Sequence, residues 1–547
     1  MVSLEWELPV LNTLSPTFTL AISALLPIAA LLVLLVGLKW TAVRAAVVGF
    51  FAAVLVAMLF YKTTGGQIVT ESLKGLWNSV SIIIVIFPAI LIYEISLQSG
   101  AFPAIRKEVT RLIPDRLLQV LALGWCFSSF LQGPSGFGVP IAVTAPLLIA
   151  IGVKPLWAVA IPLLGHAWAN TFGTLALAWD ALVQQVELPG DVWVSAAIWS
   201  GIFLLFMNVL AGIFICWFFG GVRSVLHGLP AIVVLSAVMG GGQMLLAAPL
   251  PSLATVVPTT AALGCCLLLA KMGRYSAAKP DETSPVMQSV TEEPKPLSAD
   301  GLNLHQAMLP YYALTVISLV VLLVKPLKAY LGGVVTTSFA FPGATTGLGF
   351  VSEGSERYSP ISWLIHSGFF LLLSAVVAGA YYLGRKALTG DGVNTALKQT
   401  WKKALPASLS VVLLIGMSKV MGGSGQTDVL AHSAAELTGS WYGVLSPLVG
   451  VLGAFMSSSN VSSNILFSQF QASTAGLTGF DVAVILAAQT SGGALGCMIS
   501  PSKVMLGATT AGVVGREGDI IRKLVGVSVI CAVLMGCLVI LFGRAGA

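Results

Sequence analysis

Hydrophobic positions along this chain fall into long uninterrupted runs separated by short polar segments. Most runs hold about twenty residues or more, which is enough for a helix to cross the hydrocarbon core of a bilayer. Two further regions, 117–186 and 441–515, are apolar but repeatedly interrupted. The pattern predicts an all-α polytopic membrane protein with about 12 transmembrane helices. The uninterrupted runs lie near residues 17–38, 40–61, 76–98, 191–218, 225–247, 251–271, 305–331, 360–384, 404–422 and 524–543.

The first interruption is the stretch SSFLQGPSGFGVP at residues 128–140. Glycine and proline disfavour a continuous helix, and backbone left outside a helix in hydrocarbon costs several kcal/mol for each unsatisfied group. Such a break is tolerated only where protein or a water-filled cavity satisfies the backbone. We therefore expect a re-entrant helical hairpin near 117–152 and a second one near 441–476, where SSSNVSSN occupies 457–464.

The two interrupted regions occupy equivalent places in an internal repeat. When the second half is shifted back by 325 positions, the runs and breaks of the two halves coincide in order. Placing the basic connections in the cytoplasm gives both chain termini an external location and gives the halves opposite orientations. This predicts inverted-topology repeats, the architecture of many secondary transporters. The predicted division is a first repeat at 1–224, two connecting transmembrane helices at 225–271, a flexible cytoplasmic linker at 272–304 and a second repeat at 305–547.

Composition agrees with a membrane protein and excludes several functions. Hydrophobic residues make up 56% of the 547 positions and charged residues only 9%, against about a quarter charged in soluble domains. The net charge of +6 is spread over short loops, so it bears on topology, and we expect no nucleic-acid partner. The seven cysteines show no CxxC or CxxH spacing, so we expect no metal site. Soluble-enzyme motifs such as HExxH and GxSxG are absent, so we expect neither an enzyme nor a cofactor.

The breaks carry polar groups that could bind a solute inside the membrane. Unwound segments offer N–H groups and positive helix ends to an anion, and carbonyl oxygens to a cation. The alternative is that their glycines and prolines only permit close helix packing. The expected substrate-binding residues are Gln132, Ser135, Gly136 and Gly138 in the first hairpin, His166, Asn170 and Thr171 in the following helix, Ser459, Asn460, Ser462, Ser463 and Asn464 in the second hairpin, and Thr490, Ser491 and Gly492 in the last broken helix.

Ionisable residues inside the apolar runs are candidates for binding a coupling ion, because intramembrane acids are costly and usually functional. Glu94 lies near the cytoplasmic end of its run, and Asp180 follows the first broken helix. His166 and Asn460 complete the candidates, and both H⁺ and Na⁺ stay open as coupling ions. Lys503 could be an anion partner or a cytoplasmic anchor, and we favour the anchor.

Three stretches resemble the L-lactate permease family, which includes glycolate permeases. They are PDRLLQVLALGWCFSSFLQGPSGFGVPIAVTAPLLIAIGVKPLWAVAIPLL at 114–164, SSSNVSSNILFSQFQA at 457–472, and TSGGALGCMISPSKVMLGATTAGVVGREGD at 490–519 with the RK that follows at 522–523. The GFG-x-P-x-A and MISP elements are the more specific parts, and the order and spacing cover nearly the whole chain. The resemblance implies proton-linked uptake of small monocarboxylates across the bacterial cytoplasmic membrane. It also implies kinship with ion transporters in which a mobile domain carrying two hairpins moves against a fixed scaffold.

The chain departs from the family pattern at three places where charge matters. The resemblance implies a Glu at the place of Gln132, an Asp at the place of Asn460 and a Lys at the place of Cys497, and all three residues are neutral here. His166, Glu94 or Asp180 could take the proton in their place. A site of hydroxyls and amides could instead hold Na⁺ through oxygen ligands.

We therefore expect a symporter that moves a small organic anion across the bacterial inner membrane. The expected substrate is L-lactate or a related 2-hydroxy monocarboxylate such as glycolate, coupled to H⁺ or Na⁺. The bilayer and the coupling ion are the expected partners, and a homo-oligomer stays open. The alternatives are a Na⁺-coupled transporter of a different carboxylate, a passive anion channel, and a membrane-embedded enzyme that uses His166 with a nearby acid.

Overall fold

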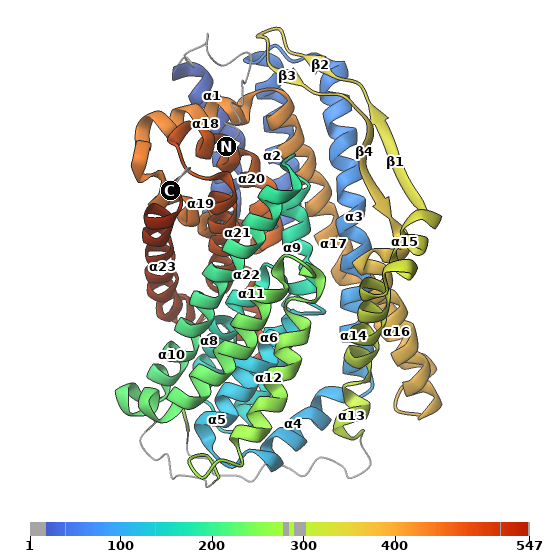
Figure 1. Cartoon of the computed structure of the whole chain (residues 1–547), viewed down its shortest axis with the longest axis vertical. Helices are drawn as coiled ribbons and strands as arrows, with labels where there is room; N and C mark the ends of the chain where they lie inside the picture. Colours follow the sequence, from blue (N-terminus) through green and yellow to red (C-terminus); the bar gives the residue numbers. More distant parts are fainter. Residues whose placement is uncertain are drawn as a thin grey trace.

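The computed structural model describes residues 18–38, 40–136, 138–276, 284–288, 302–514 and 516–544, which form an elongated bundle of helices (Figure 1). In this described part, nine helices are long and apolar enough to cross a membrane, or ten if the bent pair α14 (Leu309–Leu323) and α15 (Lys325–Val334) counts as one span. The predicted polytopic, mostly helical membrane protein is confirmed. The predicted count of about 12 transmembrane helices is not confirmed, because breaks leave several apolar helices shorter than a full span.

The helices follow the two halves of the sequence. The first half contains α1 (Phe18–Leu32), α2 (Ala42–Leu59), α3 (Gly65–Gln98), α4 (Ala101–Leu112), α5 (Arg116–Leu121), α6 (Ser128–Gln132), α7 (Val139–Ala150), α8 (Pro155–Gly165), α9 (Gly173–Val183), α10 (Gly190–Ser236), α11 (Gly242–Ala247) and α12 (Val256–Leu269). The second half contains α13 (Leu304–Ala307), α14 (Leu309–Leu323), α15 (Lys325–Val334), α16 (Ser367–Gly384), α17 (Gly390–Gly423), α18 (Gln426–Thr438), α19 (Tyr442–Ser457), α20 (Asn460–Thr478), α21 (Val482–Ile499), α22 (Pro501–Thr510) and α23 (Glu517–Phe542). Short π-helical and 3-10 segments join several of them: η1 (Val33–Gly37), η2 (Ala122–Phe127), η3 (Ala167–Asn170), η4 (Ala237–Gly241), η5 (Pro251–Leu253), η6 (Trp363–Ile365) and η7 (Gly439–Trp441).

Helices α2 and α3 recur in the second half as α16 and α17. The members of each pair have equal lengths, 18 and 34 residues. Each second copy begins 325 positions after the first, from 42 to 367 and from 65 to 390. Thr64 and Thr389 cap α3 and α17 by accepting a hydrogen bond from a backbone N–H in the first turn. In space α2 packs against α17, and α16 packs against α3. Each shorter helix therefore packs against the long helix of the other repeat, on either side of the α3–α17 contact.

Helices α3 and α17 run antiparallel. Near the start of α3, Gln67 Nε2 donates a hydrogen bond of 2.9 Å to the carbonyl of Gly423. Near its end, Glu94 forms an ion pair of 2.5 Å with Lys403. The two helices hold equivalent places in the sequence repeat and point in opposite directions. At this pair, the second copy is therefore inverted relative to the first.

One region departs from the predicted all-α fold. Between α15 and α16 the chain forms two short antiparallel strand pairs, β1 with β4 and β2 with β3, which lie along α3 (Figure 1). Trp77 of α3 donates to the carbonyl of Tyr358 (3.2 Å) and meets the ring of Phe339 edge-on. β-Branched and aromatic residues favour strands, but this short segment between two long apolar runs carries no clear period. The strands are β1 (Thr336–Phe341), β2 (Ala344–Thr345), β3 (Val351–Ser352) and β4 (Ser355–Ser362).

Part of the predicted flexible linker is ordered. Residues 284–288 lie against the connection between α7 and α8, where Met287 forms an antiparallel bridge with Val153. Lys154 Nζ also donates to the carbonyl of Pro285 (2.9 Å). These contacts attach the middle of the predicted linker to the helical body. Residues 277–283 and 289–301 lie outside the described residues.

Candidate functional site

The first predicted hairpin is built from α6 and α7. Helix α6 ends at Gln132 and α7 begins at Val139. Between them Gly136 and Gly138 have φ angles of 54° and 85°, in the left-handed region that favours glycine. A Cβ on Gly136 would lie 2.1 Å from Oγ1 of Thr174. Glycine at this position therefore lets the break approach the next broken helix.

The helix that follows this hairpin is broken as well. Helix α8 ends at Gly165, η3 follows, and α9 opens with three left-handed residues, Thr174, Leu175 and Ala176. The N–H of Leu175 donates to the carbonyl of Gly133 over 2.9 Å. Backbone that leaves a helix inside the membrane needs such a partner. This one hydrogen bond satisfies a donor in the broken helix and an acceptor in the hairpin.

The second half contains a hairpin and a broken helix at the predicted places. Helix α19 ends at Ser457, Ser458 is left-handed with φ 60°, and Ser459 caps α20 by accepting from the N–H of Ser462 (3.3 Å). Helix α21 gives way to α22 at Pro501, whose ring nitrogen has no hydrogen to donate. Only the break between α19 and α20 has a side-chain cap, which Ser459 supplies; Ser500 before α22 makes none.

Polar side chains from both halves meet between the breaks. Asn460 Nδ2 donates to the carbonyl of Thr490 (3.0 Å) and lies 3.3 Å from Oγ1 of Thr171. The Thr171 hydroxyl also donates to the Thr490 carbonyl (3.2 Å). Asn464 Nδ2 contacts Oγ1 of Thr490 (2.9 Å) and the carbonyl of Ala178 (2.8 Å). All four polar residues are buried, so the structure brings these predicted site residues together inside the protein.

Several polar atoms at this junction are buried without a hydrogen-bond partner in the described part of the chain. An unsatisfied buried donor or acceptor costs about 1–3 kcal/mol, so each such group in a native protein calls for an explanation. A solute, an ion or water bound between the breaks would satisfy these atoms. They are Oε1 of Gln132, Oδ1 of Asn460, Oδ1 of Asn464, Oγ of Ser491 and Nδ1 of His166.

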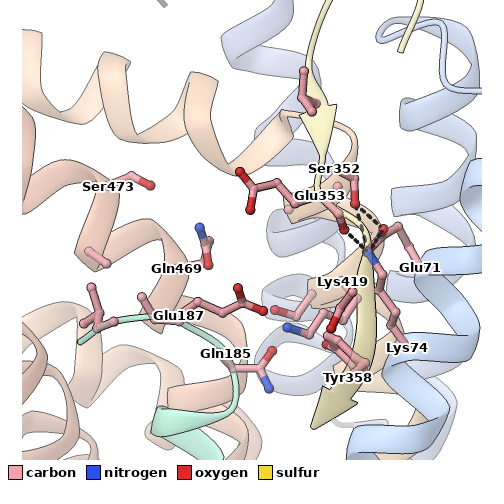
Figure 2. Close-up of a pocket in the computed structure, with 18 of the residues that line it drawn as sticks. Glu71, Lys74, Gln185, Glu187, Ser352, Glu353, Tyr358, Lys419, Gln469 and Ser473 are labelled. Carbon is pink, nitrogen blue, oxygen red and sulfur yellow. Dashed lines mark hydrogen bonds and ion pairs between the residues drawn. The ribbon is translucent and has the colours of Figure 1, made fainter. Parts of the chain in front are cut away.

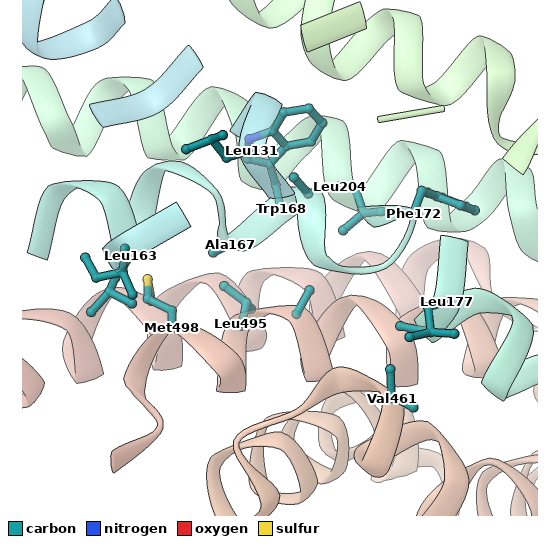
Figure 3. Close-up of a cluster of buried hydrophobic side chains, with 14 of the residues drawn as sticks. Leu131, Leu163, Ala167, Trp168, Phe172, Leu177, Leu204, Val461, Leu495 and Met498 are labelled. Atoms are coloured by element: carbon teal, nitrogen blue, oxygen red, sulfur yellow. The ribbon is translucent and has the colours of Figure 1, made fainter. Parts of the chain in front are cut away.

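Buried apolar side chains lie beside the junction (Figure 3), among them Phe172, which follows Thr171, and Val461, which follows Asn460. Leu163 and Ala167, on either side of the break between α8 and η3, lie against Met498 and Leu495 of α21. Trp168 points away from α21, toward Leu131 and Leu204. Apolar walls lower the local dielectric and strengthen any electrostatic contact made inside them.

Other predicted site residues make contacts within the protein framework. The hydroxyl of Ser135 donates to a carbonyl one turn earlier (2.6 Å), and that of Ser463 donates to a carbonyl of α19 (2.9 Å). A Cβ on Gly492 would lie 2.0 Å from a carbonyl of α19, which matches the alternative of close helix packing. Gly138 lies against Leu506 of α22.

The two candidate acids have different surroundings. The Glu94 side chain is only 1% exposed and is paired with Lys403, so its charge is already balanced in the α3–α17 contact. Asp180 on α9 has no ion pair or side-chain hydrogen bond among the described residues. It lies two residues after Ala178, whose carbonyl accepts from Asn464.

Lys503 lies inside the protein and not at the membrane surface, where the favoured prediction of a cytoplasmic anchor would put it. A cytoplasmic anchor would reach the membrane surface, but Lys503 is only 9% exposed. Its Nζ donates to Oδ1 of Asn170 over 3.2 Å. Asn170 Nδ2 in turn donates to the carbonyls of His166 (3.3 Å) and Ala167 (2.9 Å). The available signal was the position of Lys503 just after Pro501, in the first turn of a helix that begins at an interior break.

A buried polar chain braces the second hairpin and was not anticipated. The Tyr442 hydroxyl donates to Oε1 of Gln471 (2.5 Å), and Gln471 Nε2 donates to Oε1 of Gln489 (2.9 Å). Gln489 Nε2 then donates to Oγ of Ser463 (3.1 Å). Two glutamines inside apolar segments were the available signal. These hydrogen bonds join α19, α20 and α21, and so fix the position of the helix that begins at Asn460.

A separate cavity of about 370 Å³ lies near the start of α3 (Figure 2). In it Lys74 is held by Glu71 (2.8 Å) and by Oγ of Ser352 in β3 (3.1 Å). No predicted site residue lines it, but α20 contributes Gln469 and Ser473. At 1.5 Å per residue, Gln469 is roughly 14 Å along α20 from the second break, so one helix connects the cavity with the junction.

Comparisons with known proteins cover nearly the whole chain. The family model described as L-lactate permease matches residues 20–544. The L-lactate permeases of Halalkalibacterium halodurans and Escherichia coli K12 are each 28% identical, over 93% and 94% of this chain and 95% and 94% of theirs. Glycolate permease GlcA of Escherichia coli K12 is 27% identical over 95% of both chains. The crystal structure of the Alcanivorax borkumensis YdaH transporter has a TM-score of 0.43 and 14% identity, over 85% of this chain and 86% of that chain. On the family match, the chain belongs to the L-lactate permease family and is a multi-pass membrane transport protein.

Proposed function

We propose that this protein is a secondary active transporter, a symporter for L-lactate or a related 2-hydroxy monocarboxylate such as glycolate, in the bacterial inner membrane. The observation that carries the proposal is the buried cluster of Thr171, Asn460 and Thr490, where broken helices from both halves meet. Breaks of this kind are tolerated in a bilayer where they line a site. The names of the relatives, L-lactate permease and glycolate permease, support a substrate of this size and chemistry.

The substrate binds between the two breaks. A 2-hydroxy acid offers a hydroxyl donor, and Oδ1 of Asn460 and Oδ1 of Asn464 are buried acceptors that lack one. A Cβ on Gly493 would lie 2.1 Å from Oδ1 of Asn460, so a glycine there keeps the space around this acceptor. Gln132 Oε1 and Ser491 Oγ supply further polar contacts. Because the cluster is buried, the substrate reaches it only when the surrounding helices move.

Alternating access arises from the two inverted repeats, 1–224 and 305–547, with the α3–α17 pair as the fixed scaffold. A Cβ on Gly75 of α3 would lie only 2.8 Å from Cα of Gly416 in α17, so these helices approach too closely to slide easily. The Glu94–Lys403 ion pair joins them again at the other end. The hairpin-bearing helices move against this pair and open the junction to one side at a time.

Two kinds of group could couple transport to an ion. Asp180 is an acid without a cationic partner in the described residues and can carry a proton. The unpartnered amide oxygens of Gln132, Asn460 and Asn464 are ligands of the type that Na⁺ accepts. We favour H⁺ through Asp180, because a single acid in this position can bind and release a proton without remodelling the cluster.

The test is uptake of labelled L-lactate, glycolate and other carboxylates into proteoliposomes, with pH and Na⁺ gradients imposed separately. The expected result is accumulation above the external concentration, driven by an inward pH gradient. Accumulation driven only by Na⁺ would transfer the coupling role to the amide oxygens. Uptake that stops at equal concentrations under either gradient would identify a passive channel. No uptake of any carboxylate by folded protein would overturn the proposal.

A further inference from the structure

Lys503 is a buried cation without a carboxylate partner among the described residues. Its ammonium contacts Oδ1 of Asn170 at 3.2 Å, a neutral acceptor. Removing a charge from water is costly unless an opposite charge compensates it. A cation in this setting favours a ligand that carries a negative charge.

The Lys503 ammonium lies near the start of α20, because it bonds to Asn170 and the next residue, Thr171, accepts from Asn460 Nδ2 (3.3 Å). Cys497 is 1% exposed and stands one turn after Gly493 on α21, where an added Cβ would lie 2.1 Å from Oδ1 of Asn460. Asn460 is the first residue of the 19-residue helix α20, and the first N–H groups of a helix form its positive end. An anion beside the thiol would therefore meet an ammonium and a helix N-terminus together.

His166 offers a second polar contact at the same place. It follows the last residue of α8, at the break between α8 and η3, and is 1% exposed. Its Nδ1 has no hydrogen-bond partner in the described part of the chain. It lies close enough to Lys503 for an electrostatic interaction. Asn170 connects the two residues, because it accepts from Lys503 and donates to the His166 carbonyl.

We propose that Lys503, together with the first turn of α20, binds the carboxylate of the transported solute and so restricts transport to anions. This inference rests on the proposed function and names the group that recognises the substrate charge. Cys497 in the last turn of α21 and Lys503 in the first turn of α22 lie on either side of the break at Ser500 and Pro501, so an ammonium placed at 497 can also face the start of α20.

The test is uptake of labelled L-lactate by the purified full-length protein in proteoliposomes, at matched amounts of folded protein. Lys503→Gln is expected to lower uptake by about tenfold or more, because a charged hydrogen-bond donor to the carboxylate is lost. The double variant Cys497→Lys with Lys503→Ser is expected to restore uptake to within about threefold of the wild type. Lys402→Gln, which removes an exposed lysine of α17, is the matched control and leaves uptake unchanged.

A purely structural role for Lys503 predicts a different pattern. If Lys503 only holds Asn170 in place, moving the lysine to 497 does not restore uptake by the folded double variant, and that result overturns the inference. Near-normal uptake by folded Lys503→Gln overturns it as well. A wild type that takes up no carboxylate marks a failure of the proposed function instead, so the two failures are distinguishable.

A measurement on the unmodified protein keeps the inference testable even if Lys503→Gln does not fold. L-lactate is expected to slow alkylation of the native Cys497 thiol by N-ethylmaleimide, because its carboxylate occupies the space beside that thiol. Cys537 is exposed, and its alkylation rate is the internal control that L-lactate leaves unchanged. A Cys497 rate that is insensitive to saturating L-lactate, in protein that transports L-lactate, contradicts the inference.

Discussion

The two hairpins hold equivalent places in the repeat but are made differently. The first break uses backbone, with Gly136 and Gly138 left-handed and Leu175 donating to Gly133. The second break uses side chains, with Ser459 capping α20 and Asn460 reaching Thr490. Equivalent positions in an inverted repeat therefore need not share chemistry. We interpret the first hairpin as the part that shapes the junction and the second as the part that binds.

The largest effect is expected from Gly136→Ala, which breaks the first hairpin. The added Cβ would lie 2.1 Å from Thr174 Oγ1 at a φ of 54°, so both the contact and the backbone are strained. L-lactate uptake into proteoliposomes should fall about 100-fold, to the background of empty vesicles. Gly264→Ala in α12 is the control, because nothing lies within 4 Å of its Cβ. More than half of wild-type uptake by Gly136→Ala would refute this role of the first hairpin.

The next effect comes from Asn460→Ala in the second hairpin. The substitution removes the amide that joins Thr171 and Thr490, and a lost buried hydrogen bond costs about 1–3 kcal/mol, or about 5- to 150-fold in binding. The concentration of L-lactate that gives half-maximal uptake should rise accordingly. Thr478→Ala, at the far end of the same helix and bonded to its own backbone, should stay near wild type. Equal effects of the two substitutions would argue against a binding role for this hairpin.

A smaller and more selective effect separates the two acids. Asp180→Asn should reduce accumulation driven by a pH gradient by about tenfold, while exchange of labelled for unlabelled L-lactate continues, because only proton carriage is lost. Glu94→Gln should keep both activities and lower the melting temperature by a few degrees, because Lys403 loses its partner. If Glu94→Gln abolishes gradient-driven uptake and Asp180→Asn does not, the coupling role passes to Glu94.

The smallest difference lies between two serine hydroxyls. Ser135→Ala should change uptake by less than about twofold, because its hydroxyl bonds only to its own hairpin. Ser491→Ala should reduce uptake by about three- to tenfold, because Ser491 Oγ has no partner in the described residues and is free to contact a solute. Initial rates over a range of L-lactate concentrations measure both. The reverse order would exchange the roles assigned to these two hydroxyls.

Apolar runs and their interruptions predicted the membrane architecture and the places of the breaks. Gly136, Ser459 and Pro501 lie at interruptions because local chemistry, such as positive φ, capping or a missing N–H, decides where a helix stops. The β-strand insertion was missed because 336–362 is short and without a clear period. Its strands are held by contacts with Trp77, which is far away in the sequence.

The sequence predicted most of the polar residues of the candidate site, but not the burial of Lys503 beside them. Sequence identified Asn460, Thr171 and Thr490 as polar groups near breaks, and the structure joins them. Lys503 was misjudged because a lysine near the end of an apolar segment usually reaches the membrane surface. It is buried because α22 packs among α7, α8, α21 and α23, and because its ammonium bonds to Asn170.

The most direct test of the central claim asks whether one solute protects both breaks. In a variant whose native cysteines are replaced by serine or alanine, Thr171→Cys and Ser459→Cys each place a single thiol at one break, and alkylation is followed with increasing L-lactate. If the breaks enclose a common site, L-lactate slows alkylation of both thiols with the same half-protecting concentration, and that concentration matches the half-saturation of uptake. Protection of only one thiol, or of neither, in protein that still transports L-lactate would contradict the account.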